Sequence, residues 1–255
     1  MTEQGMVVAD WPAPANVHTL VTTRKGGISE APYASFNVAN HVGDTPLAVA
    51  GNRDLLREEL PSRLSCQWLD QVHSAQVAVI EGAGSVITAD GLVTREPDIG
   101  CCVLTADCLS VLFTNKEGTE IAVAHGGWRG LLGGILKNTI VALESPSNDL
   151  VVWLGPAIGP CHYEVGNKIK QEFLISCSSD DEREIINQSF LASEEEGKLR
   201  FDLRKLARQQ LQLLGVNEIY GEESCTYCDE SNFYSYRRDG VTGRMASIIY
   251  FTEAS

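Results

Sequence analysis

Short apolar runs recur along the chain, and each is bounded by Gly, Asp, Asn or charged residues. Runs with such boundaries are typical of buried β-strands. The run from Val17 to Thr22 alternates instead, which predicts a strand with His18 as an ordinary strand residue. The buried strands are expected in or around Val77–Ile80, Cys101–Leu104, Leu109–Phe113, Ile121–Ala124, Val151–Leu154 and Ala246–Phe251.

Segments with helical spacing lie between these runs, most clearly over Leu203–Leu214. Asp202 is placed to cap its N-terminus, and Gly215 is placed to end it. Several strand runs follow one another without a helix between them, which favours a mixed α/β fold with a mixed sheet over a regular doubly wound fold. Further helices are expected at Pro46–Leu60, Gly130–Leu143 and Gly166–Ser176.

No internal repeat and no Pro/Ser-rich linker divides the chain, so residues 1–255 are predicted to form one domain. The polar stretch Ser176–Lys198 is the one candidate for a long mobile surface loop. Ile185, Ile186, Phe190 and Leu191 are the side chains that would anchor part of it.

The composition, with 44% apolar residues among 255, is that of a globular protein with a full core. Its formal charge of −14 disfavours nucleic acid and anionic membranes as partners, although a local arginine cluster still permits a small anion. The N-terminal residues lack the pattern of a signal peptide, and no apolar stretch approaches a membrane span. The eight cysteines are therefore expected to be reduced, in a cytoplasmic protein.

His73, Cys108 and His125 each stand at the edge of an apolar run, where side chains from distant parts of a chain can converge. Two imidazoles and one thiolate suit Zn²⁺, and three protein ligands leave a fourth position open, as catalytic zinc requires. Their separations of 35 and 17 residues match no compact zinc-finger spacing. Two structural histidines and a small buried cysteine remain the alternative.

The glycines after His125 favour the functional interpretation. Gly126, Gly127 and Gly130 are costly in regular structure unless the backbone turns sharply or approaches a ligand closely. If a helix begins near Gly130, its N–H groups and Arg129 form a site for an anion.

Several motifs, in the same order, resemble the YfiH family, also called laccase-domain or polyphenol-oxidase-like proteins. The resemblance covers nearly the whole chain. Its motifs are Thr23–Ser29, Asn37, His41–Asp44, Asn52–Arg53, Asp70–His73, Ala89–Gly91, Thr105–Cys108, Ala124–Gly130, Gly159–Val165 and Tyr234–Arg244.

This resemblance implies a three-layer mixed α/β fold with zinc or copper on the residues that match His73, Cys108 and His125. Family members are credited with phosphorolysis of adenosine, inosine, guanosine and methylthioadenosine, with adenosine deamination, and with phenol oxidation. Bacterial members are also credited with correcting peptidoglycan precursors. Purine nucleoside and phosphate are therefore the expected small-molecule partners, and the oligomeric state stays open.

Residues for binding substrate or phosphate are expected around the metal. Arg129 is the first choice because it lies in the glycine segment next to His125. Weaker candidates for phosphate binding are Arg237, Arg238 and Arg244. The alternative is that these three are ordinary surface cations. For Asn37, the alternative to binding a ligand is that its side chain caps a helix or stabilises a turn. The full set of expected binding residues is Gly126, Gly127, Arg129, Gln71, Asn37, His41 and Arg53, and the candidate proton donors are Asp70, Gln71, Asp90 and Asp107.

Three other functions compete with a zinc-dependent nucleoside enzyme. A copper oxidase is one, but five histidines in the whole chain are too few for a four-copper assembly. A metal-free hydrolase with Cys108 as nucleophile and His125 or His73 as base is another. A non-catalytic metabolite-binding protein is the third.

Three further cysteines are given less weight. Cys225 and Cys228 form a Cys-x-x-Cys pair, but no second pair accompanies it, so Cys225→Ser is expected to change metal content little. Cys161 matches a family motif, whereas His162 is assigned no role.

Overall fold

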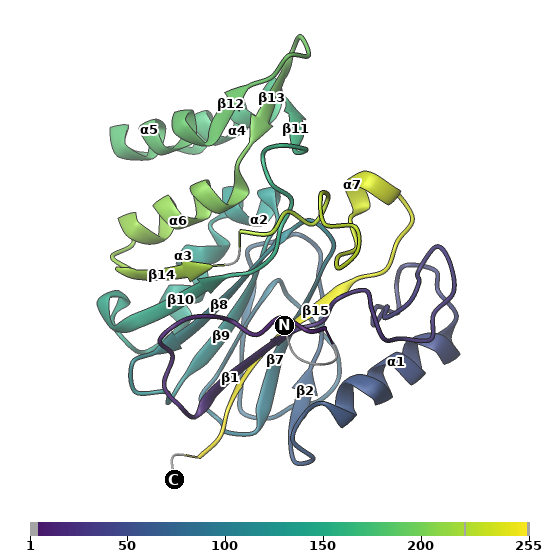
Figure 1. Cartoon of the computed structure of the whole chain (residues 1–255). Helices are drawn as coiled ribbons and strands as arrows, with labels where there is room; N and C mark the ends of the chain where they lie inside the picture. The colour runs from purple at the N-terminus through teal and green to yellow at the C-terminus, as the bar shows by residue number, and fades with distance from the viewer. Residues whose placement is uncertain (1–4, 222, 254–255) are drawn as a thin grey trace.

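The computed structural model describes residues 5–221 and 223–253. Two stacked β-sheets form its centre, with helices on both outer sides (Figure 1). The strands are β1 Val17–Val21, β2 Ser65–Gln67, β3 Leu69–Asp70, β4 Val77–Ile80, β5 Ile87–Thr88, β6 Gly91–Thr94, β7 Ile99–Thr105, β8 Leu109–Asn115, β9 Ile121–Gly126, β10 Leu150–Leu154, β11 Glu164–Gly166, β12 Phe190–Ala192, β13 Lys198–Phe201, β14 Glu218–Gly221 and β15 Met245–Phe251. The helices are α1 Pro46–Glu58, α2 Trp128–Gly133, α3 Ile135–Ala142, α4 Asn167–Ser176, α5 Asp180–Ser189, α6 Leu203–Leu213, α7 Tyr236–Asp239 and the short 3₁₀ helix Ser147–Asp149.

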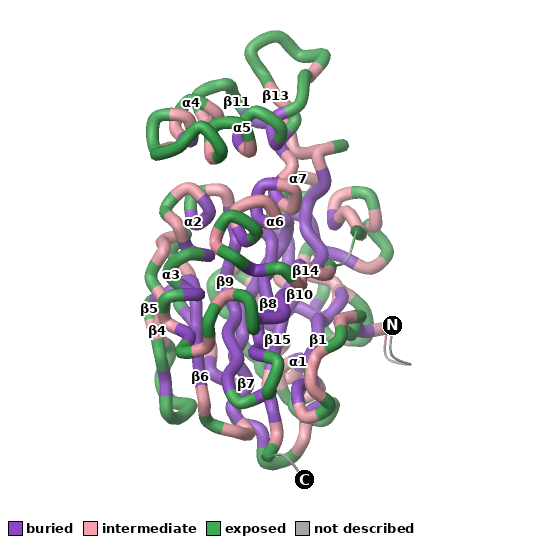
Figure 2. The backbone as a smooth tube through the Cα atoms, turned by 90° about the vertical axis from the view of Figure 1, so that its left-hand side faces the viewer, coloured by how far each residue is buried: buried purple, intermediate pink, exposed green. Residues whose placement is uncertain are grey.

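Both large sheets are mixed. The first has the order β1-β15-β7-β2, in which only β2 and β7 run parallel. The second has the order β14-β10-β8-β9-β6-β4, with antiparallel pairs inside and a parallel pair at each edge. Every residue of β7, β8, β9 and β10 is buried, as expected for strands covered on both faces (Figure 2). The predicted mixed α/β class is confirmed.

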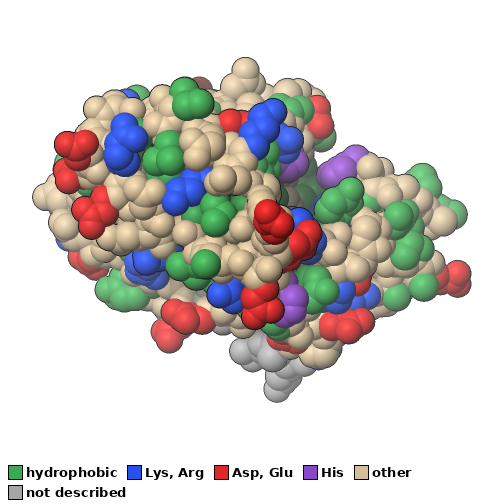
Figure 3. Space-filling view, turned by 90° about the horizontal axis from the view of Figure 1, so that it is seen from above, with side chains coloured by type: hydrophobic (Ala, Val, Ile, Leu, Met, Phe, Trp, Pro, Cys, Tyr) green, Lys and Arg blue, Asp and Glu red, His purple; other side chains and the backbone are tan. Residues whose placement is uncertain are grey.

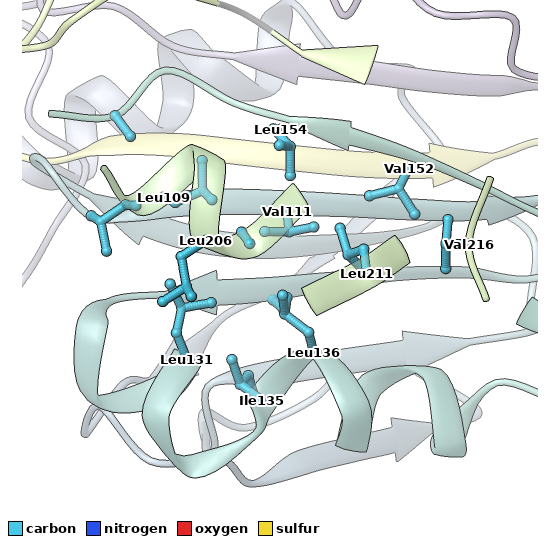
Figure 4. Close-up of a cluster of buried hydrophobic side chains, with 14 of the residues drawn as sticks. Leu109, Val111, Leu131, Ile135, Leu136, Val152, Leu154, Leu206, Leu211 and Val216 are labelled. Carbon is cyan, nitrogen blue, oxygen red and sulfur yellow. The ribbon is translucent and has the colours of Figure 1, made fainter. Parts of the chain in front are cut away.

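Three hydrophobic clusters separate four layers. One lies between the two sheets and includes Val103, Leu112 and Trp153. Another lies between the second sheet and the helices α2, α3 and α6, where Leu131, Ile135, Leu136, Leu206 and Leu211 face the strands (Figure 4). The third packs α1 on the outer face of the first sheet. The expected three layers are thus four, because the buried strands divide between two sheets.

Local signals in the sequence set the helix ends. The Asp202 side chain accepts a hydrogen bond from the backbone N–H of Lys205 at 3.0 Å, and Gly215 follows α6 with φ +88°, as predicted. The helix expected over Gly130–Leu143 instead begins at Trp128 and breaks at Gly134, whose φ is +84°. Gly is the residue that adopts this left-handed conformation most readily.

The prediction of a mobile loop over Ser176–Lys198 is wrong. The segment forms α5 and β12, and β12 joins β11 and β13 in a small sheet that forms the upper part of the view in Figure 1. Ser179 caps α5 by accepting from the N–H of Glu182, and acidic residues fill its first turn. Ile186 and Phe190 are buried and anchor the segment. Within the described residues, no helix is long and apolar enough to cross a membrane.

Candidate metal centre and active site

The structure brings the three predicted metal ligands together at the ends of strands. His125 lies in β9, Cys108 directly precedes β8, and His73 lies in the loop after β3. One ligand atom from each lies within 4.8 Å of the others, and the Cys108 Sγ is 4.0 Å from the His73 Nε2. His125 is buried, Cys108 is half-buried and His73 is exposed, so the cluster opens to solvent on one side.

Asp90, which directly precedes β6, fixes two of these ligands. Its buried carboxylate lies 2.8 Å from the His125 Nδ1, which leaves the other ring nitrogen for the site. It also accepts hydrogen bonds from the backbone N–H groups of Val72, His73 and Ser74. Burial raises the pKa of the Asp90 carboxyl, but hydrogen bonds from His125 and Ser74 outweigh it and lower the pKa to about 2.

Cys108 and His125 act on each other electrostatically. Burial raises the pKa of the Cys108 thiol, but the charge of His125 and hydrogen bonds from His125 and His73 lower it to about 6. Burial lowers the pKa of His125, whereas the negative charge of Cys108 and the hydrogen bond to Asp90 raise it to about 9. The thiolate that metal binding or nucleophilic attack requires is therefore favoured at neutral pH.

Asp107 holds the turn that presents Cys108. Its φ of +95° is unusual for a residue with a side chain. One carboxylate oxygen accepts from the Thr226 hydroxyl at 2.7 Å, and the other accepts from the Arg237 backbone N–H at 2.7 Å. Its carbonyl oxygen accepts from the N–H of Ile158 at 2.9 Å. Segments distant in the sequence thus fix the backbone next to Cys108.

The glycines after His125 serve close packing rather than a sharp turn. A Cβ on Gly127 would lie 3.1 Å from the Cys108 Sγ, 3.2 Å from the His73 Cδ2 and 3.6 Å from the His125 Nε2. Gly126 belongs to β9, where a Cβ would lie 3.1 Å from the Leu109 carbonyl oxygen. Neither glycine has a positive φ. Gly127 is thus the residue that lets the backbone pass directly against the ligand set.

Arginines surround the opening of the site. Arg129 is exposed, stacks over the Trp128 ring at 4.4 Å, and forms no salt bridge within the part of the chain that the structure describes. Arg244 is half-buried; burial lowers its pKa, while the negative charges of Cys108 and Asp107 oppose this. Arg237 stacks over the Tyr163 ring at 5.1 Å. Seen from above, Figure 3 shows histidine side chains beside a hollow in the surface.

Three of the expected binding residues have structural partners instead. Both polar atoms of the Gln71 amide pair with the backbone of Leu104 on β7, at 2.9 and 2.7 Å. Asn37 is fully buried; its amide bonds to Ala39 and Asp44 within its own loop region and accepts a hydrogen bond from the backbone N–H of Arg244, which is distant in the sequence. The Arg53 Nε donates to the Val38 carbonyl, and its guanidinium stacks over Trp68 at 4.2 Å. These polar groups serve the fold in the structure, and a part for the three residues in binding substrate or phosphate stays a prediction.

The remaining candidates divide by exposure. His41 is exposed, and its pKa is lowered by burial of part of the ring and by Arg244, while Asp70 opposes the shift. The guanidinium of Arg238 forms a salt bridge with Asp239 and donates hydrogen bonds to the carbonyl oxygens of Thr226, Tyr227 and Phe233. A cavity of about 250 Å³ lies elsewhere, between α2, α3, α4, α5 and α6, and none of the proposed metal ligands lines it.

One group of potential ligands was missed in the sequence. Cys161 and His162 meet Cys225 and Cys228, with one ligand atom from each within 4.8 Å of the others. The motif Gly159–Val165 and the Cys-x-x-Cys pair were both visible, but 64 residues separate Cys161 from Cys225. No spacing rule connects ligands that far apart.

Comparison with known proteins agrees with this architecture. The family described as "Multi-copper polyphenol oxidoreductase laccase" matches residues 18–252. The chain is 44% identical over 245 residues to "Purine nucleoside phosphorylase PA4543" of Pseudomonas aeruginosa, covering 96% of this chain and 97% of the relative. It is 40% identical over 248 residues to "Purine nucleoside phosphorylase YfiH" of Escherichia coli, covering 96% of this chain and 98% of the relative.

Solved structures show the same fold. The crystal structure of Neisseria meningitidis protein NMB0706 superposes with a TM-score of 0.90 at 43% identity, over 97% of this chain and 99% of the other. YlmD from Geobacillus stearothermophilus gives a TM-score of 0.89 at 30% identity, over 99% and 98% of the two chains. The chain therefore belongs to the YfiH family, whose family description is multi-copper polyphenol oxidoreductase laccase.

Proposed function

We propose that this chain is a zinc-dependent purine nucleoside phosphorylase that also deaminates adenosine. The observation that carries the proposal is a three-ligand cluster, open on one side, with Arg129 two residues after Gly127, whose backbone passes against the ligands. Relatives that align over almost the whole chain bear the name purine nucleoside phosphorylase. Adenosine, inosine, guanosine and methylthioadenosine are the proposed substrates.

The donor set fits zinc. His73, Cys108 and His125 offer two nitrogens and one sulfur, and the fourth position of a tetrahedral ion stays free. The carboxylate of Asp90 on the far nitrogen of His125 is the partner that metal-bound histidines commonly have. When bound, zinc polarises a substrate oxygen or lowers the pKa of water to about 7. Copper on the same ligands remains the alternative to test.

Phosphate binding is assigned to Arg129. Stacking on Trp128 keeps the guanidinium beside the start of α2, where the first N–H groups have no partner within the helix. The backbone at Gly127 passes directly against the ligands and brings these groups close to the open side. Phosphorolysis needs such an anion site because a phosphate oxygen attacks the ribose carbon as the bond to the purine breaks.

The departing purine must receive a proton or a hydrogen bond. Asp90 is unsuited because its pKa of about 2 keeps it ionised. Both oxygens of Asp107 already accept hydrogen bonds, and the Gln71 amide pairs with Leu104. Asp70 keeps an exposed carboxylate, and we assign it together with His41 to the nucleoside side of the site.

Incubation of zinc-loaded protein with adenosine, with and without phosphate, tests the proposal. Chromatography should reveal adenine and ribose 1-phosphate only when phosphate is present, and inosine in both samples. Inosine alone would leave a deaminase and remove the phosphorylase. The absence of products from all four nucleosides would overturn the proposal.

A metal-free cysteine hydrolase is the second candidate, supported by a specific arrangement. The imidazole of His125 can take the proton of the Cys108 thiol and hold it as an imidazolium, while the Asp90 carboxylate orients the ring, so the three form a nucleophile, a base and an orienting group in series. Such an enzyme would keep its activity after chelation and lose it after alkylation of Cys108. A zinc enzyme would lose its activity after chelation and regain it with added zinc.

A copper polyphenol oxidase, the third candidate, takes its support from the family description. The five histidines of the chain are too few for a four-copper assembly. Phenol oxidation is therefore expected only with copper bound at the His73, Cys108 and His125 cluster. Equal phenol oxidation by zinc-loaded protein would contradict this assignment.

A further inference from the structure

A second cluster of ligating side chains lies outside the site described above. Cys161 and His162 come from the loop between β10 and β11, and Cys225 and Cys228 come from the segment after β14. The Cys161 Sγ lies 3.6 Å from the sulfur of Cys225 and 3.6 Å from that of Cys228. The Cys228 Sγ lies 3.2 Å from the His162 Nδ1.

These separations lie within about 0.4 Å of the edges of a tetrahedron around zinc. Zinc–sulfur bonds of about 2.3 Å place two sulfurs about 3.8 Å apart, and a nitrogen about 3.6 Å from a sulfur. A disulfide needs sulfurs about 2.0 Å apart, and it would use two of the three cysteines. We propose that Cys161, His162, Cys225 and Cys228 bind a second zinc ion, and that this zinc is structural.

The surroundings of the cluster hold the ligands ready. The Gly159 N–H donates to the Cys225 Sγ at 3.1 Å, which stabilises a thiolate. The ring of His162 stacks on Tyr227 at 4.0 Å and is thereby oriented toward Cys228. A backbone bridge between Ala157 and Cys225 joins the two segments independently. The ligands are therefore brought together by contacts other than the zinc itself.

The number of ligands separates this site from the first. Four protein ligands complete the coordination of zinc and leave no position for water or substrate, which is the pattern of structural sites. The cluster of His73, Cys108 and His125 supplies only three. The proposal corrects the expectation that the Cys225 and Cys228 pair lacks partners, and it gives His162 a role. It does not depend on the proposed reaction.

The second zinc acts on the first site through the Asp107 turn. Thr226, which lies between the two cysteines of the pair, donates to the Asp107 carboxylate next to Cys108. Arg237 reaches the same carboxylate with its backbone N–H, and its guanidinium donates to the Glu164 carbonyl just after His162. Zinc would cross-link the segment of Thr226 to the segment of His162 and Glu164, on which Arg237 is anchored.

Metal analysis of protein purified without added metal tests the proposal. We expect two zinc ions per chain in the wild type, one in Cys228→Ser, one in His73→Ala and none in the double variant. Cys177→Ser is the matched control: the thiol of this half-buried cysteine donates to the Leu174 carbonyl and belongs to neither ligand cluster, so the variant should keep both ions.

X-ray absorption at the zinc edge of the wild type covers the case in which a variant fails to fold. Two sites give about two sulfur ligands per zinc on average, whereas the first site alone gives about one. In His73→Ala, the remaining zinc should have three sulfurs and one nitrogen. One sulfur per zinc in the wild type, or a disulfide among the three cysteines in its mass spectrum, would overturn the proposal.

Discussion

Asp90→Asn is the substitution that most directly tests how the metal ligands are held. One carboxylate oxygen of Asp90 accepts from the His125 Nδ1 and the His73 N–H, and the other accepts from the N–H groups of Val72 and Ser74 and from the Ser74 hydroxyl. The asparagine amide keeps only one of these two oxygens. Whichever way it turns, its NH₂ group faces donors that lose their acceptor.

The expected magnitude follows from this count. A buried donor without an acceptor costs about 1–3 kcal/mol, so losing the acceptor for two or more donors should lower the free energy of unfolding by about 2–4 kcal/mol. The pKa of Asp90, lowered from 3.8 to about 2, corresponds to a similar figure of about 2 kcal/mol. That stability is present above pH 3.8 and is lost as pH falls through about 2. Removing an orienting carboxylate should also weaken zinc binding about 10-fold to 100-fold.

Urea unfolding of zinc-free protein and competition with a chelator measure the two effects separately. Glu120→Gln is the matched control, because Glu120 is a buried carboxylate that accepts from the N–H groups of Glu144 and Ser145. It lies at the opposite end of β9 from His125. We expect the control to lose stability and keep its zinc affinity. Zinc affinity in Asp90→Asn equal to that of the wild type would refute the reasoning.

Three further substitutions or treatments test the site. Gly127→Ala should lower zinc affinity at least several-fold, measured by chelator competition, because its Cβ would press on the ligands, whereas Gly82→Ala, with open space around it, should not. In zinc-free protein, alkylation of Cys108 should speed up with pH around a midpoint of about 6; a midpoint near that of free cysteine, about 8.5, would contradict the paired charges. Arg129→Ala should reduce phosphorolysis about 10-fold to 100-fold more than it reduces deamination. Arg183→Ala, in α5, is the control. Equal losses in both activities would argue for a structural role of Arg129.

The strands were predictable because burial on both faces leaves a direct mark on the sequence. The apolar runs at Leu109 and Ile121 lie inside β8 and β9, which are buried throughout, whereas Val77–Ile80 forms the edge strand β4, where only Ile80 is buried. Which strands pair was not predictable in this way. Val17 pairs with Phe251 across almost the whole chain, and nothing local in either segment specifies the other. The division into two sheets, and so the fourth layer, depends on such pairings.

Of the candidate site, only the metal-ligating residues were predictable from the sequence. His73, Cys108 and His125 were recognisable by residue type, by position at strand ends and by resemblance. Asp90 was named as a proton donor, but its contacts make it the acceptor that orients His125. Gln71 looked equally available, yet its amide pairs with Leu104. Whether a polar side chain faces ligand or backbone is decided by tertiary contacts that the local sequence does not contain.

Two residues of the site have an unusual backbone conformation, and they show how the site keeps its shape. His73 and Asp107 have φ of +59° and +95°, and conformations of this kind cost about 1–3 kcal/mol each. Such strain persists only where the surroundings hold it. Asp90 holds His73 from the start of β6, whereas Asp107 is held by Thr226, which lies between two cysteines of the second cluster, and by Arg237 of α7. The two sides of the metal centre are therefore supported independently, so losing the second zinc should loosen the Cys108 side and leave the paired histidines in place.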